Sequence, residues 1–71
     1  MPGEGAQYIA FIQDVLITVH QNLRELESRK AFADAAELDY IDGKIAAYRE
    51  LIKMLQMSAD DHALPRDEIG L

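Results

Sequence analysis

Histidine and carboxylate side chains are the residues of this chain with which acid–base chemistry or metal binding could be done. His20 and His62 are the two histidines, and Asp39 and Asp42 lie three residues apart. A zinc site needs three or four ligands that converge on one point, and a catalytic carboxylate needs an opposing acid, base or nucleophile. The two histidines belong to distant segments, and no such partner accompanies the aspartates. We therefore expect a non-enzyme with no catalytic residue, no metal site and no cofactor.

Basic residues gather near the middle of the chain, where they could bind phosphates. Arg24, Arg29 and Lys30 alternate there with Glu25 and Glu27. Nucleic-acid-binding proteins neutralise phosphates with a basic surface, whereas this chain has 7 basic and 13 acidic residues and a formal charge of −6. Glu25 and Arg29 have the four-residue spacing of an ion pair on one helical face. The composition argues against a nucleic-acid partner and predicts a solvated, ion-paired surface.

Cysteine is absent, so the chain has neither a disulfide nor a thiolate metal site. This composition fits a reducing compartment such as the cytoplasm. The N-terminal sequence MPGEG lacks the positive region of a signal peptide. The apolar stretch YIAFIQDVLITV is interrupted by Gln13 and Asp14 and is too short to cross a bilayer. We expect a cytoplasmic protein without a membrane partner.

Two stretches with helical periodicity must position these side chains. Apolar residues recur three and four positions apart over Ile9–Leu26 and again over Leu38–Leu55, which is the spacing of one stripe on a helix. The pattern breaks near residues 30–34, where Asp34 and Glu37 have the D-x-x-E spacing of a helix cap. We predict helices over residues 6–30 and 35–57 with a turn at 31–34. One continuous helix of about 50 residues is the alternative, because the turn contains no glycine or proline.

The predicted fold is all-α, an antiparallel two-helix hairpin over residues 6–57. A leader at residues 1–5, with two glycines and a proline, precedes it and is expected to be flexible. An acidic tail follows at residues 58–71, and its composition is typical of a mobile chain end.

The hairpin has more apolar residues than one seam between two helices can bury. The surplus lies at the start of the first helix and the end of the second, which are neighbours at the open end of an antiparallel hairpin. Burial of apolar area is worth about 25 cal/mol per Å², and broad apolar patches mark interfaces. We predict a C2 homodimer that forms a four-helix bundle, with either parallel or antiparallel subunits. The predicted dimer interface contains Tyr8, Phe11, Ile12, Val15, Leu16, Met54 and Leu55. The alternative to a second copy is that the tail folds back, so that Leu64, Ile69 and Leu71 cover the apolar residues that the two helices leave unburied.

A second candidate surface surrounds Gly43, which lies inside the second predicted helix. Glycine costs about 1 kcal/mol there relative to alanine, and the heptad register places Gly43 opposite the seam. Small residues let another backbone approach closely, and exposed tyrosines are frequent hot spots. We predict a face for a partner protein that contains Tyr40, Gly43, Lys44, Ala47 and Leu51. A glycine tolerated on a solvated face is the alternative.

Two resemblances suggest what such a hairpin does. The layout resembles the Rop-like plasmid RNA-binding proteins, which implies a dimeric bundle, although the row of basic residues that RNA binding needs beside Phe11 is missing. The stretch AELDYIDGKIAAYREL resembles helical hairpins of small phage and prophage accessory proteins. That resemblance implies an accessory protein that binds and inhibits a host regulator.

We expect a dimeric, non-enzymatic protein that binds another protein, such as a host transcriptional regulator, and inhibits or modulates it by covering a groove. A Rop-like RNA-binding bundle is one alternative. A small structural or chaperone subunit of a larger complex, such as a secretion system, is the other.

Overall fold

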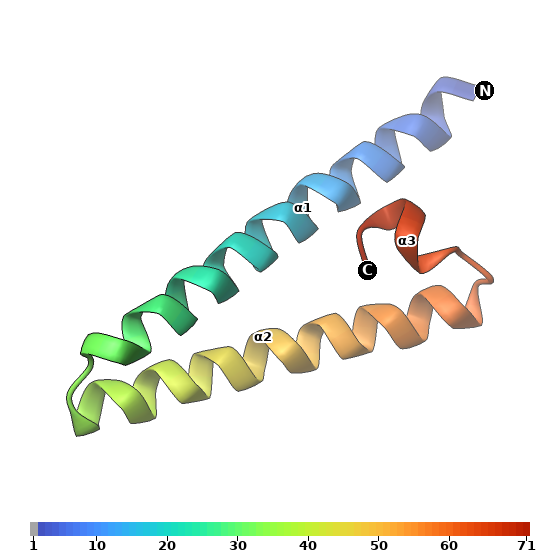
Figure 1. The fold of residues 1–71 in the computed structure, drawn as a ribbon. Coiled ribbons are helices and arrows are strands. Elements are labelled where there is room, and N and C mark those ends of the chain that lie inside the picture. The colour runs from blue at the N-terminus through green and yellow to red at the C-terminus, as the bar shows by residue number, and fades with distance from the viewer. Residues whose placement is uncertain (1) are drawn as a thin grey trace.

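A computed structural model describes residues 2–71, with side chains from residue 5 onward. The chain forms α1 (Pro2–Arg29), the short 3₁₀ helix η1 (Lys30–Phe32), α2 (Ala35–Asp61) and α3 (Arg66–Ile69), and the described residues contain no strand. Figure 1 shows α1 and α2 joined at one end, running in opposite directions and diverging toward the other end. The all-α helical hairpin predicted from the sequence is confirmed.

Both long helices extend beyond their predicted ends. α1 begins at Pro2 rather than at residue 6, because the missing N–H of a proline would be unpaired in the first turn of a helix in any case. The predicted leader is therefore helical from residue 2, and Met1 lies outside the described residues. α2 ends at Asp61 rather than at residue 57. Continuing the helix past Ser58 places Ala59 in the core, where it is buried.

The connection between α1 and α2 lies where the break in periodicity predicts it. Ala33 follows η1 in an extended conformation, and the Asp34 Oδ1 atom accepts a hydrogen bond of 2.9 Å from the backbone N–H of Glu37. An ion pair of 2.9 Å between Lys30 Nζ and Asp42 Oδ1 ties the connection to α2. The alternative of one continuous helix is wrong, because the extended backbone at Asp34 ends one helix and caps the next.

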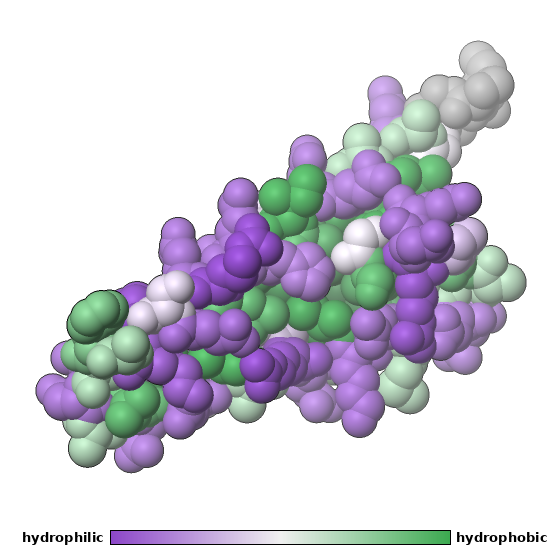
Figure 2. All heavy atoms as spheres, in the orientation of Figure 1, coloured by the Kyte–Doolittle hydropathy of each residue, from purple (hydrophilic) through white to green (hydrophobic). Residues whose placement is uncertain are grey.

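The core has two parts, one at each end of the hairpin. Near the turn, Leu26, Ile41 and Ile45 form a buried cluster. At the open end, Leu16 of α1, Ala59 of α2 and Ile69 of α3 are buried. Figure 2 shows hydrophobic residues along the junction of the two long helices and hydrophilic residues along their outer edges. The third helix therefore completes the half of the core in which the two long helices diverge.

The tail folds back onto the hairpin rather than extending as the expected mobile segment. α3 lies between α1 and α2 at the open end (Figure 1). Gln13 Nε2 donates to the Glu68 carbonyl at 2.7 Å, and Gln56 Nε2 donates to the Leu71 carbonyl at 3.2 Å. Burial of Ile69 favours docking, since a buried isoleucine is worth about 1.5–3 kcal/mol. The alternative of a tail that folds back is therefore confirmed for Ile69, whereas Leu64 stays 49% exposed.

The reversal after α2 has the hydrogen bonds of a Schellman motif. The Leu64 N–H donates to the Ala59 carbonyl at 2.8 Å, and the Ala63 N–H donates to the Asp60 carbonyl at 3.0 Å. Ala63 has the left-handed backbone conformation, with φ of 55°, at the position where glycine is usual. Gly70 occupies the corresponding position after α3, with φ of 92°. The tail is thus held by two left-handed residues, of which only one is a glycine.

Candidate protein-interaction face

One side of the hairpin carries an apolar surface away from the docked tail. On α1, Gln13 and His20 are hydrogen-bonded to tail carbonyls. Phe11, Val15 and Asn22 lie on the opposite side of α1, because an α-helix turns by about 100° per residue. We term this side of the molecule the open face. It carries Phe11, Val15 and Asn22 of α1 and the neighbouring Tyr48 and Leu51 of α2.

The open face contains two shallow depressions that share the half-buried Tyr48. The depression nearer α1 is lined by Phe11, Asp14, Val15, Thr18, Val19, Asn22 and Tyr48. The depression nearer α2 is lined by Lys44, Ala47, Tyr48 and Leu51. Tyr8 and Leu55 continue the face by helical spacing, since they lie three and four residues from Phe11 and Leu51. Phe11 and Val15 of the predicted dimer residues and Lys44, Ala47 and Leu51 of the predicted partner residues therefore lie on one side of the hairpin.

Tyr48 joins the two helices at the floor of the open face. Asn22 Nδ2 donates a hydrogen bond of 3.1 Å to the Tyr48 hydroxyl. This bond holds the ring between the two depressions. Neither residue was assigned to a site from the sequence, because Tyr48 follows the spacing of the seam. The available signal was a tyrosine among aliphatic seam residues, since a buried tyrosine hydroxyl needs a hydrogen-bond partner.

The predicted dimer residues separate into exposed and buried ones. Tyr8 is 75% exposed and Phe11 67% exposed, and Val15 and Met54 are also exposed. Ile12 and Leu55 are half-buried. The assignment of Leu16 to the interface is corrected, because this side chain is only 1% exposed within the single chain. Gly70 lies against Leu16, because a Cβ added to the glycine would be in ordinary van der Waals contact with it at 3.7 Å.

The predicted partner residues are all exposed on α2. The Lys44 Nζ atom lies 5.0 Å from the centre of the Tyr40 ring, a cation–π arrangement. Hydrogen bonding to Tyr40 raises the pKa of Lys44 above its ordinary value of 10.5. A Cβ added to Gly43 would meet nothing within 4 Å. Packing within the hairpin therefore does not require a glycine at this position.

Three of the side chains considered for chemistry, His20, His62 and Asp42, have structural partners. A His20 ring nitrogen donates to the Gly70 carbonyl at 3.3 Å, and a His62 ring nitrogen donates to the Ser58 carbonyl at 2.9 Å. Within residues 2–71, no group of three histidine or carboxylate side chains is placed to hold a metal ion. Asp42 pairs with Lys30 at the turn.

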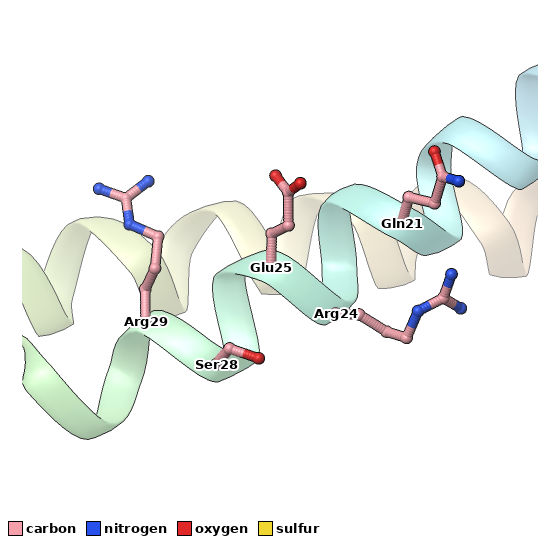
Figure 3. Close-up of a pocket in the computed structure, with 5 residues that line it drawn as sticks. All are labelled: Gln21, Arg24, Glu25, Ser28 and Arg29. Atoms are coloured by element: carbon pink, nitrogen blue, oxygen red, sulfur yellow. The ribbon is translucent and has the colours of Figure 1, made fainter.

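The polar strip on α1 is an open surface. Figure 3 shows that its side chains all come from α1 and spread in different directions. The residues are Gln21, Arg24, Glu25, Ser28 and Arg29, and each is exposed. Such a strip cannot enclose a substrate or exclude water from it. No helix in the described part of the chain combines the length and apolarity needed to cross a membrane.

No family model, curated protein or solved structure matches this chain. The open face is therefore the feature from which we infer the function.

Proposed function

We propose that this chain is a non-enzymatic helical protein that forms a homodimer through the open face and binds another protein. The open face itself carries this proposal, because it leaves Tyr8, Phe11 and Leu51 in water. Burial of each such side chain is worth about 1.5–3 kcal/mol. Among the side chains that the structure describes, no buried polar atom lacks a hydrogen-bond partner. The buried polar atoms therefore have hydrogen-bond partners, whereas the large apolar side chains of the open face remain in contact with water.

A second copy is the occupant that this surface favours. C2 dimers are the commonest oligomers, because one patch then serves both subunits. Two hairpins packed face to face make a four-helix bundle. In that bundle Tyr8, Phe11, Val15, Met54 and Leu55 contribute to the dimer contact, while Leu16 stays under the tail of its own chain.

The protein partner is proposed to bind along α2 at the edge of the open face, around Tyr40 and Gly43, which line neither of its depressions. Gly43 and Ala47 lie one helical turn apart and form a low strip beside Tyr40. A glycine without a packing role inside the hairpin supports this assignment, because it lets a helix of another protein approach closely. The proposed action is inhibition or modulation of a cytoplasmic partner, such as a transcriptional regulator, by covering one of its helical surfaces. This is the role of a small accessory protein of the phage type.

Sedimentation velocity of two matched phenylalanine variants tests the homodimer. Phe11→Asp places a charge on the open face and should convert the dimer to a monomer. Phe32→Asp makes the same change at the turn, where Phe32 is 91% exposed, and should leave the dimer intact. A wild-type chain that sediments as a monomer at 100 µM, or equal dissociation of both variants, would refute the homodimer.

Capture of the partner from the native cell, followed by mass spectrometry, tests the strip on α2. Gly43→Leu should abolish capture, while circular dichroism shows unchanged helicity. Ala46→Leu is the control, because Ala46 is also exposed but points away from the open face by helical spacing. Equal capture by Gly43→Leu and the wild type would remove this part of the proposal.

A further inference from the structure

We propose that the two copies pack with their turns at the same end, so that α1 of each copy lies against α2 of the other. This inference rests on the proposed homodimer and names the orientation of the second copy on the open face. The periodicity of the sequence fits both orientations. The distribution of apolar and charged residues along the folded hairpin distinguishes them.

Contacts between α1 and α2 show which residues lie at the same height. Asn22 is level with Tyr48, and Lys30 is level with Asp42. With a rise of 1.5 Å per residue in both helices, Glu25 then lies near the height of Lys44. The two side chains indeed line the same depression. By the same counting, Val15 lies near the height of Met54 and Met57.

Apart from Asp14, the open face is apolar toward the open end, and it is charged toward the turn. The exposed apolar residues of the open-end half are Tyr8, Phe11, Val15, Leu51 and Met54. Toward the turn, Glu25, Arg29 and Lys44 line one depression with Asn22, Leu26 and Tyr48. A two-fold axis parallel to the helices places each half against the same half of the second copy. An axis perpendicular to the helices places Glu25 and Arg29 against the apolar half, where burial of an unpaired charge is strongly unfavourable.

An antiparallel pair could still match its apolar halves if the copies slid apart until only their open ends overlapped. The size of the hairpin argues against this arrangement. The Cα atoms span 52 × 21 × 14 Å, so an offset pair would use only about half of the broad face and would bury about half of the area that full overlap buries. Full overlap with like halves together gives a large contact area and also places apolar residues against apolar residues. This arrangement needs the turns at the same end.

The charges toward the turn complement each other in this orientation. Glu25, Arg29 and Lys44 are the charged residues there, while Asp14 is the one charged residue that lines the depression in the apolar half. With α1 of one copy over α2 of the other, Glu25 of each copy lies opposite Lys44 of the other. The two-fold axis makes this pair occur twice. Opposite charges at such positions set the orientation of a complex more than its affinity.

Distances between spin labels test the orientation directly. The chain has no cysteine, so Ala31→Cys labels the turn alone and Gln7→Cys labels the open end alone. Helices in contact lie 8–10 Å apart, so we expect both label pairs to be separated by roughly 30 Å or less. In an antiparallel dimer with full overlap, both distances would approach the 52 Å length of the hairpin. In the offset antiparallel dimer, only the Gln7→Cys pair would be close.

A charge reversal provides the second test. Lys44→Glu should raise the dimer dissociation constant about fivefold or more, and adding Glu25→Lys should restore it. Lys53→Glu is the control and should leave it unchanged, because Lys53 lies on another side of α2 by helical spacing. A monomeric wild type would refute the homodimer and this inference together. A dimer whose turn labels lie near 50 Å apart, or whose charge reversal is not rescued, would overturn the orientation alone, because the homodimer would still stand.

Discussion

Substitution by alanine is expected to stabilise the chain at Gly43 and to destabilise it at Gly70. At Gly43 the backbone is helical and an added Cβ would meet no atom within 4 Å. Gly43→Ala should therefore gain the full difference in helix propensity, about 1 kcal/mol. At Gly70 an added Cβ would have room, with Leu16 at 3.7 Å, but φ is +92°. Alanine in that left-handed conformation costs about 1–2 kcal/mol, so Gly70→Ala should weaken the docking of the tail.

Thermal unfolding followed by far-ultraviolet circular dichroism measures both effects. In a domain of this size, 1 kcal/mol shifts the midpoint by about 4–8 °C. Gly43→Ala should raise Tm by about that amount, and Gly70→Ala should lower it by a similar amount or more. The scans need several protein concentrations, because dimerisation makes Tm depend on concentration.

Gly5→Ala is the matched control for the helical glycine. An added Cβ would again meet nothing within 4 Å, but helix ends fray, so its gain in Tm should be smaller than that of Gly43→Ala. A lower Tm for Gly43→Ala at dilute concentration would mean that the hairpin itself needs the glycine. A neutral Gly70→Ala would mean that the left-handed residue does not hold the tail.

Three further substitutions or conditions test the tail and the floor of the open face. Ala63→Gly should stabilise the chain by about 0.5–1 kcal/mol, measured by urea unfolding, because glycine adopts the left-handed conformation of the Schellman motif without strain. Hydrogen bonding to Arg66, with contacts of 3.0 and 2.6 Å, lowers the pKa of Asp60 below its ordinary 3.8. The Asp60–Arg66 pair should therefore stabilise the docked tail fully above pH 3.8 and stop doing so as the pH falls through the lowered pKa of Asp60. Amide exchange in the tail measures this pH dependence. Asp60→Asn should remove it. Tyr48→Phe removes the hydrogen bond from Asn22 and should cost about 0.5–1.5 kcal/mol in urea unfolding; an unchanged midpoint would show that the bond does not stabilise the floor.

The sequence by itself determined the features that depend on neighbouring residues. The alternating three- and four-residue spacing predicted both long helices, and Asp34 with Glu37 predicted the start of the second one. These signals are local, because a helical stripe and a cap involve residues within one or two turns of each other. The start of α1 at Pro2 differs from the predicted start at residue 6, because proline and glycine are typical of loops but proline also fits the first turn of a helix.

Only the tertiary structure decided which apolar residues remain exposed. Leu16 belongs to the same helical stripe as Ile12, and no local pattern shows that α3 covers it. The docking of α3 depends on contacts between distant segments, such as Gln13 with Glu68. The tail occupies one side of the hairpin, and the residues around Tyr48 on the other side stay open. Periodicity places a residue on a helix face, but burial of that face depends on what the rest of the chain packs against it.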